Sequence, residues 1–195
     1  MLTPRFDTAL AYASDVHRQQ IRKGSEVPYI SHLLGVASIT LEFGGDEDQA
    51  IGALLHDSAE DQGGERRLLD IRRRFGDGVE QIVRDCSDSL GEEKPSDTSR
   101  RKEEWRARKE HYLGALRAKP ARSLLVSLAD KTHNSEAIVM DLHRSGHGVW
   151  QRFTGERDGT IWYYDELLNT FAELMPSLVY RLDRAFRDMH TFPSD

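Results

Sequence analysis

The sequence predicts an all-α fold, a single domain built as a helical bundle. Apolar residues recur three and four positions apart along nearly every ordered-looking stretch, which is the period of an amphipathic helix rather than of a strand. Start signals such as Thr3-Pro4 and stop signals such as Gly44-Gly45 separate these stretches. At 195 residues the chain is long enough for one domain with a sizeable core. It has no internal repeat or linker, so residues 1–195 are expected to form that domain.

The first three helices are delimited by proline, glycine and a capping aspartate. An apolar stripe over residues 6–16 follows the Thr3-Pro4 start. A second helix over about 31–43 ends at Gly44-Gly45. Asp46 then offers a side-chain oxygen to cap a third helix, expected over 46–61.

The middle of the chain alternates between charged helices and a polar loop. Gly76 separates two short helices, expected at 65–75 and 77–87. Residues 88–99 combine Gly and Pro with polar side chains and are expected to form a mobile loop. A long charged helix is expected at about 100–118.

The last third is expected to hold three helices. Pro120 opens one that continues toward Leu142, and a glycine-containing loop is expected at 145–159. Helices over 160–174 and, after Pro176, over 177–189 complete the bundle.

Composition limits the classes of partner. No apolar run reaches the roughly 18–20 residues of a bilayer span, and the N-terminus lacks the apolar stretch of a signal peptide, so we expect a cytoplasmic protein with no membrane partner. The single Cys86 agrees with a reducing compartment and follows a helical core pattern. A net charge of -6 disfavours a nucleic-acid partner but allows a small phosphorylated ligand. The sequence does not indicate an oligomeric state.

Four side chains from three separate parts of the sequence have the chemistry of a metal site. His56-Asp57 ends the apolar run Ala53-Leu54-Leu55, His32 lies upstream, and Asp130 follows another apolar run. Buried helices that present imidazoles and carboxylates need a partner for them, because isolated buried charge is costly. We therefore predict that His32, His56, Asp57 and Asp130 bind a metal ion. A mixed nitrogen and oxygen set suits Mn²⁺, and Fe²⁺, Co²⁺, Ni²⁺ or Zn²⁺ less specifically.

Further charged residues lie beside these ligands. Glu60 and Asp61 follow one helical turn after His56-Asp57, where they could orient a water molecule and handle protons. Arg22-Lys23 precedes Gly24, which suggests a turn that presents two cations near His32. Such a pair is usually an exposed loop, but beside a phosphate site it could bind a polyphosphate.

The chain resembles the HD superfamily, and within it the hydrolase domain of the RelA/SpoT proteins and the small alarmone hydrolases. The resemblance covers roughly residues 6–175. The segments that carry it are, in order, His17-Arg-Gln-Gln-Ile-Arg-Lys-Gly24, Pro28-Tyr-Ile-Ser-His32, Ala53-Leu-Leu-His-Asp-Ser-Ala-Glu-Asp61 and Ser127-Leu-Ala-Asp-Lys-Thr-His-Asn134.

This resemblance implies an HD-type helical bundle and a Mn²⁺-dependent enzyme that removes the 3′-pyrophosphate from guanosine 3′,5′-bis-polyphosphates. By motif match, the four predicted ligands bind the metal, and Glu60 and Asp61 are the catalytic acidic pair. Arg22, Lys23 and Asn134 match substrate-binding residues, and Tyr163 aligns less securely with a tyrosine that contacts the nucleotide. The chain ends soon after its last helix, so we expect degradation of an alarmone without its synthesis.

Two alternatives remain open at this point. One is an HD phosphohydrolase acting on another nucleotide, such as an adenine alarmone, NADPH or a nucleoside monophosphate. The other is a helical module that binds a nucleotide without catalysis. Loops 88–99 and 145–159 are where we expect substrate preference to be set.

Overall fold

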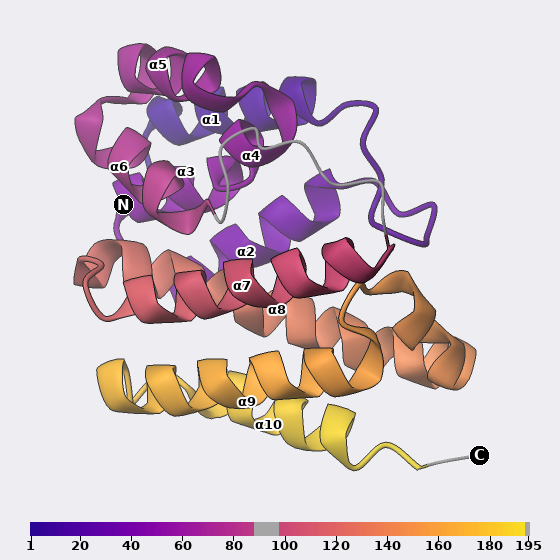
Figure 1. Ribbon diagram of the computed structural model, residues 1–195. Coiled ribbons are helices and arrows are strands. Elements are labelled where there is room, and N and C mark those ends of the chain that lie inside the picture. Colours follow the sequence, from indigo (N-terminus) through magenta and orange to yellow (C-terminus); the bar gives the residue numbers. More distant parts are fainter. Residues whose placement is uncertain (88–97, 194–195) are drawn as a thin grey trace. The chain divides into compact units, whose positions relative to one another are not determined.

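The computed structural model describes residues 1–87 and 98–193 (Figure 1). Within these ranges the chain is helical, and Ile21 and Pro28 form an isolated antiparallel bridge instead of any strand. The all-α prediction is confirmed. In chain order the helices are α1 (Pro4–Val16), α2 (Ile30–Glu42), α3 (Glu47–Leu55), α4 (Ser58–Gln62), α5 (Gly64–Phe75), α6 (Asp77–Cys86), α7 (Thr98–Leu116), α8 (Ala121–Ser145), the 3₁₀ helix η1 (Gly146–Arg152), α9 (Glu156–Leu174) and α10 (Tyr180–His190).

The chain groups into two compact units. The first comprises the described residues within 1–92 together with 119–130, and the second comprises those within 93–118 and 131–195. Helix α8 therefore contributes its first residues, up to Asp130, to unit 1 and the remainder to unit 2. The expectation of one domain over 1–195 stays a prediction.

The centre of unit 1 is α3, which contacts α1, α2 and α6. Its start is fixed by a capping box: the Asp46 side chain accepts from the Gln49 backbone N–H at 3.0 Å, and the Gln49 side chain accepts from the Asp46 N–H at 3.0 Å. Gly52 lets α6 approach closely, since a Cβ there would lie 2.6 Å from Cγ2 of Ile82. Every residue of α3 from Gln49 to Leu55 is buried, so the helix delivers its C-terminal end into the protein interior.

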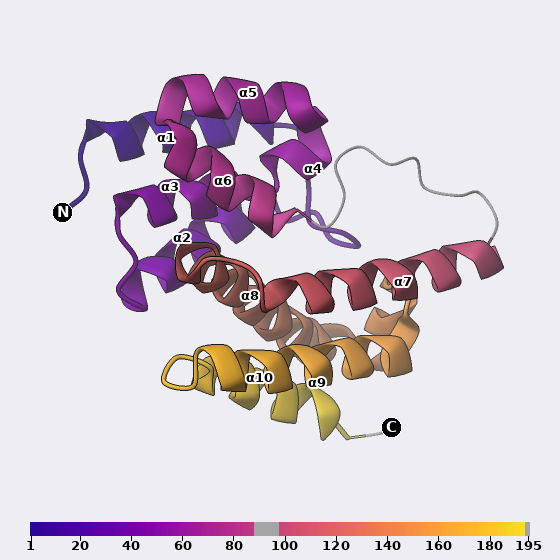
Figure 2. The same ribbon diagram turned by 60° about the vertical axis from the view of Figure 1, so that its left-hand side comes forward.

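Unit 2 is organised around aromatic packing between α7 and α9. The Trp105 ring lies against Gly155 and Gly159, where an added Cβ would come within 2.5 and 3.1 Å of the indole. The Arg106 guanidinium lies 3.1 Å from the centroid of the Trp162 ring. Helices α9 and α10 lie side by side (Figure 2).

The structure corrects the expected helix bounds at three places. The helix expected over 46–61 is interrupted at His56 and Asp57, where α3 ends and α4 begins. The loop expected at 145–159 contains η1, and α9 already begins at Glu156. The last helix begins at Tyr180 rather than at 177. The loop expected at 88–99 lies almost entirely outside the described residues.

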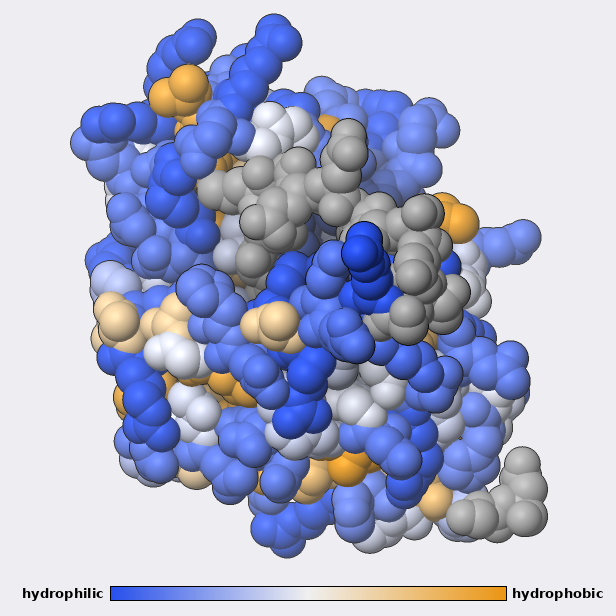
Figure 3. All heavy atoms as spheres, in the orientation of Figure 1, coloured by the Kyte–Doolittle hydropathy of each residue, from blue (hydrophilic) through white to orange (hydrophobic). Residues whose placement is uncertain are grey.

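The face of the molecule in Figure 3 is mostly hydrophilic, with hydrophobic residues scattered among polar ones. None of the helices in the described ranges is long and apolar enough to cross a membrane. Cys86 is buried in the hydrophobic core of unit 1, as its helical spacing indicated.

Candidate metal centre

The candidate ligands come from three places in unit 1. His32 lies in the first turn of α2, and Asp130 lies on α8. His56 and Asp57 occupy the junction between α3 and α4, as the C-cap of one helix and the N-cap of the other. The junction lies at the buried end of α3, so both residues are held by the packing of that helix. All four predicted ligands are brought together.

The distances define a compact cluster of nitrogen and oxygen atoms. One atom each from His32, His56 and Asp130 lies within 4.8 Å of the others, a spacing at which they could hold a metal ion. Oδ1 of Asp130 lies 3.3 Å from His32 Nε2 and 3.5 Å from His56 Nε2. Oδ2 of Asp57 lies 3.5 Å from His32 Nε2 and 3.0 Å from His56 Nε2. The two imidazoles are 1% exposed and Asp130 is 6% exposed.

The proton on His56 can be placed from its surroundings. Nδ1 of His56 lies 2.8 Å from the carbonyl oxygen of Ala53, which only accepts, so Nδ1 must donate. In the neutral ring the lone pair is then on Nε2, which is buried and has no hydrogen-bond partner within the described part of the chain. That lone pair faces carboxylate oxygens of Asp57 and Asp130. A cation between these atoms satisfies all of them, so the residues fit a metal ion.

The electrostatics of the cluster agree with this fit. Burial disfavours the charged form of His56, but Asp57 and then Asp130 outweigh it and raise the pKa of His56 well above its ordinary value. Burial likewise works against an ionised Asp57, but His56 and a hydrogen bond from His32 hold the pKa of Asp57 well below its usual range. The pocket therefore favours positive charge between ionised carboxylates.

Tyr29 contacts two of the candidate ligands, Asp57 and His32, and the sequence did not single it out. Its hydroxyl donates to Oδ2 of Asp57 at 2.6 Å, and its ring packs edge-on against His32 with the centroids 5.5 Å apart. The Arg22 guanidinium lies 5.8 Å from the Tyr29 ring centroid. The only signal in the sequence was the position of Tyr29 within the segment that leads to His32.

The predicted acidic pair lies on α4, directly after Asp57. The side chain of Glu60 is half-buried, and that of Asp61 is exposed. Oδ2 of Asp61 accepts a 2.6 Å hydrogen bond from Nε2 of Gln20. Although Asp61 keeps contact with solvent, loss of solvent around its carboxylate, followed by the negative charge of Asp57, raises its pKa. The contact with Gln20 was not predicted, because it joins residues 41 positions apart.

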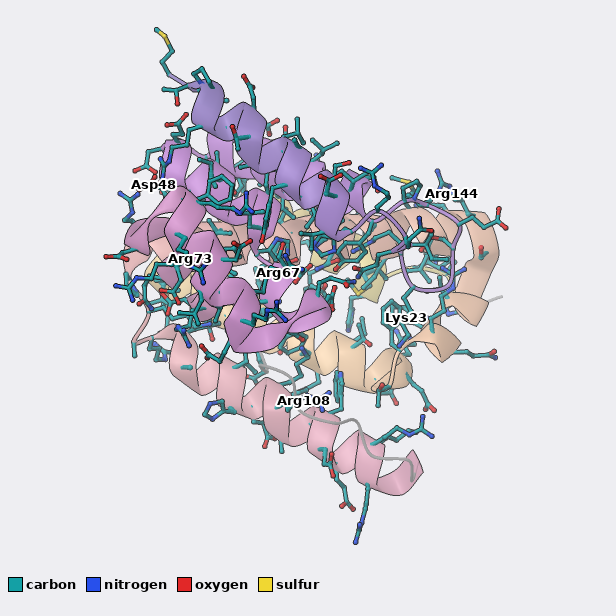
Figure 4. All side chains as sticks on the ribbon, turned by 90° about the horizontal axis from the view of Figure 1, so that it is seen from above. Lys23, Asp48, Arg67, Arg73, Arg108 and Arg144 are labelled. Carbon is teal, nitrogen blue, oxygen red and sulfur yellow. The ribbon has the colours of Figure 1, made fainter. Side chains whose placement is uncertain are left out.

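The predicted basic pair lies on the loop between α1 and α2. The Arg22 N–H donates to the Val27 carbonyl at 2.8 Å, and Gly24 has φ 74, a value at which glycine is favoured. The turn expected at Gly24 is therefore present. Figure 4 shows Lys23 on this loop.

The two remaining predicted residues belong to unit 2. Asn134 lies on α8, and Tyr163 is buried on α9 beside Trp105, with ring centroids 6.4 Å apart. The Lys109 Nζ lies 4.9 Å from the Tyr163 ring centroid. Their roles toward a nucleotide stay predictions.

The chain is similar in sequence to proteins named as pyrophosphohydrolases and pyrophosphokinases. It is 36% identical over 145 residues to guanosine-3′,5′-bis(diphosphate) 3′-pyrophosphohydrolase MESH1 of Xenopus tropicalis, across 73% of this chain and 72% of that protein. It is 35% identical over 138 residues to a GTP pyrophosphokinase of Streptomyces antibioticus, but these residues span only 15% of that longer protein.

The fold of the chain is also similar to that of a solved structure. A solved structure described as a metazoan ortholog of SpoT that hydrolyzes ppGpp aligns with a TM-score of 0.75 at 28% identity, over 96% of each chain. The family model for the HD domain matches residues 9–161, which include His32, His56, Asp57 and Asp130. The chain thus belongs to the HD domain family.

Proposed function

We propose that the protein is a metal-dependent pyrophosphohydrolase that removes the 3′-pyrophosphate from guanosine 3′,5′-bis-polyphosphates, giving GDP or GTP and pyrophosphate. The observation that carries this proposal is the buried cluster of His32, His56 and Asp130, completed by Asp57, in a chain whose relatives are named for this reaction. A single domain over residues 1–195, containing this one site, would perform the reaction.

His32, His56, Asp57 and Asp130 would hold the metal, which we propose to be Mn²⁺, although the ligand set also suits other divalent transition metals. When bound, such an ion supplies Lewis-acid polarisation of a phosphoryl oxygen and lowers the pKa of a bound water. The chain's own contribution is to hold the four ligands in place and to keep His56 in the tautomer that leaves Nε2 available.

Glu60 and Asp61 would manage the protons of the hydrolysis. Cleavage of the bond between the 3′-oxygen and phosphorus takes one proton from the attacking water and requires one at the departing 3′-oxygen. Two carboxyl groups that follow a ligand within one turn suit this exchange. The raised pKa of Asp61 suits a carboxyl group that takes up and releases a proton during the reaction.

Arg22 and Lys23 would bind the phosphates of the substrate. A chain of net charge -6 would otherwise repel a bis-polyphosphate, so fixed cations beside the site are needed. The Arg22 guanidinium is held over the ring of Tyr29, which also contacts Asp57, so it lies near the metal cluster. Asn134 and Tyr163 are proposed to contact the nucleotide. A small phosphorylated nucleotide is the partner we propose, and the cytoplasm is the proposed compartment.

The test is a product assay with several substrates in parallel. The protein loaded with Mn²⁺ is incubated with guanosine and adenosine 3′,5′-polyphosphates, NADPH and nucleoside monophosphates, and the products are identified. We expect pyrophosphate and a guanosine 5′-di- or triphosphate. Orthophosphate from monophosphates, with no pyrophosphate from any bis-polyphosphate, would assign the chain to another HD phosphohydrolase reaction. No product from any substrate, with nucleotide still bound, would indicate a binding module.

Substitution of Arg22, one residue of the basic pair, gives a second test of the proposed function. Arg22→Ala is expected to raise KM for the bis-polyphosphate by about tenfold or more, the scale of a lost charge-assisted contact, and to leave turnover of a small generic phosphate ester nearly unchanged. Arg18→Ala is the matched control, because Arg18 is an exposed arginine on the same loop that pairs with Asp15.

A further inference from the structure

A hydrogen-bonded network joins Ser58, the residue after Asp57, to Asp61. Its central members are His17, at the C-terminus of α1, and Gln20, on the loop that follows. His17 is 2% exposed and Ser58 is 0% exposed, so the network begins in the interior. It ends at the carboxylate of Asp61, which reaches solvent.

The direction of every hydrogen bond in this network can be assigned. An ionised Asp61 only accepts, so Gln20 must turn its Nε2 toward Oδ2 of Asp61, at 2.6 Å. The amide oxygen of Gln20 then lies 2.7 Å from His17 Nδ1, which must donate to it. His17 Nε2 therefore carries the lone pair and accepts from the Ser58 hydroxyl at 3.2 Å.

Two further contacts agree with this assignment. Gln62 donates from Nε2 to the same atom of Gln20 at 3.0 Å, which agrees with that atom being the amide oxygen. Burial lowers the pKa of His17, so its ring is neutral near neutral pH and one nitrogen is free to accept. The ring is held by stacking on Tyr29, with centroids 5.3 Å apart and an interplanar angle of 20°.

The local backbone gives Asp61 little rigidity of its own. It lies in α4, a helix of 5 residues that ends at Gly63, where φ is 130. An exposed aspartate on so short a helix can exchange among its χ1 rotamers. A hydrogen bond from Gln20 to Oδ2 would restrict this exchange and leave the second oxygen of Asp61 for a reacting group.

We propose that Gln20, oriented by His17, is a positioning residue that holds the Asp61 carboxylate in one rotamer for proton transfer. This inference rests on the proposed function for its effect on catalysis, but the rotamer of Asp61 can be measured without any substrate. Gln20 itself does not touch the reacting atoms; it acts through Asp61.

The kinetic test compares Gln20→Leu with Gln19→Leu. Leucine has nearly the shape of glutamine without the amide, and Gln19 is an exposed neighbour that belongs to neither the metal cluster nor the network. We expect Gln20→Leu to lower kcat by about tenfold or more, part of the range for general acid–base groups, with KM changed less than about twofold. Metal content should match the wild type. A loss of bound metal together with a marked rise in KM would mean that Gln20 has a merely structural role.

A double-mutant cycle shows whether Gln20 acts through Asp61. In the Asp61→Asn background, Gln20→Leu should lower kcat by less than about twofold further, because the group that it positions is already removed. An undiminished effect in that background would overturn the inference.

His17 offers a second pair of variants. In His17→Asn the side-chain amide nitrogen can take the place of Nδ1 and donate to Gln20, whereas in His17→Gln the amide reaches the position of Nε2 and loses that bond. We expect kcat of His17→Asn to stay within about threefold of the wild type and that of His17→Gln to fall to the level of Gln20→Leu. The reverse order would contradict the assigned directions.

An NMR measurement separates this inference from the proposed function. Three-bond couplings to Asp61 Cγ report its χ1 population in the absence of substrate. A single rotamer in the wild type and Gln19→Leu, with averaging in Gln20→Leu, would support the positioning role even if the wild type turned over none of the proposed substrates. Averaging in the wild type, or no change in Gln20→Leu, would overturn it.

Discussion

The hydroxyl of Tyr29 donates to Oδ2 of Asp57 at 2.6 Å, and the same oxygen lies 3.0 Å from Nε2 of His56. Burial, followed by the charges of Asp57 and Asp61, raises the pKa of Tyr29, so its hydroxyl stays protonated and keeps donating. The Tyr29 ring also packs against His32 and stacks on His17. One side chain therefore supports two candidate ligands and the residue that orients Gln20.

Tyr29→Phe should weaken metal binding without abolishing it. The variant keeps the ring packing and loses the hydrogen bond that orients Asp57, and removal of an outer-shell partner typically costs about 10- to 100-fold in metal affinity. Competition of Mn²⁺ with a chelator measures the change. Tyr12→Phe is the matched control, because Tyr12 donates a 2.7 Å bond to Asp70, a carboxylate outside the cluster. Equal affinities in both variants would show that Tyr29 does not orient a ligand.

Asp57→Ala should abolish metal retention and turnover together. The variant removes an oxygen that lies 3.5 Å from Nε2 of His32 and 3.0 Å from Nε2 of His56, and we expect the three remaining ligands to bind the ion too weakly to retain it. Metal content after gel filtration and release of pyrophosphate are the two measurements. Full turnover in a variant that holds no metal would remove Asp57 from the ligand set. Asp70→Ala, on α5, serves as the control for loss of a carboxylate in unit 1.

Glu60→Gln should keep the metal and lower the turnover rate by roughly 10² or more, the scale of a lost acid–base or water-positioning group. The reason is the position of Glu60, which lies on α4 beyond the junction that carries the ligands. Metal content and kcat are measured on the same preparation. Loss of metal would place Glu60 among the ligands instead, and near-normal turnover would leave Asp61 as the main proton-handling residue.

The sequence predicted most helices because their signals are local. Thr3 caps α1 with its side chain, and Asp46 forms the expected capping box at α3. The break at His56-Asp57 escaped prediction because the segment from Ala53 to Asp61 contains neither Gly nor Pro, the residues that mark a helix end. The break lies at a buried position, where His56 is 1% exposed, and sequence periodicity does not report packing of this kind.

The candidate site could be predicted only in part for the same reason. His32, His56, Asp57 and Asp130 were found because imidazoles and carboxylates are conspicuous after apolar runs. The supporting contacts were not found, because the hydrogen bonds of Tyr29 with Asp57 and of Gln20 with Asp61 join residues 28 and 41 positions apart. Such bonds depend on how α1, α2 and α4 pack. Nothing local distinguishes Gln20 from the exposed Gln19 beside it.

The pH dependence of folding should report the buried state of His17. Its pKa in the folded protein lies below the ordinary value of 6.5, first because of burial. The hydrogen bond to Gln20 and the charges of Asp57 and Asp61 act in the opposite direction, and His56 adds to the lowering. Below about pH 6.5 the unfolded chain therefore binds a proton at this residue that the folded protein does not bind. The contribution of His17 to the free energy of unfolding must then fall as the pH decreases from this value toward the folded pKa.

A comparison of the wild type with His17→Asn isolates this contribution. Urea unfolding is measured at intervals from about pH 7.5 to about pH 5, and the wild type should lose more stability over this range, with an extra slope of at most about 1.4 kcal/mol per pH unit for one proton. The other titrating groups are common to both proteins and cancel in the difference. The extra slope should appear only below about pH 6.5, because above it His17 is neutral in both states. Parallel curves would mean that His17 binds its proton equally well folded and unfolded, which its burial against Tyr29 and Ser58 argues against.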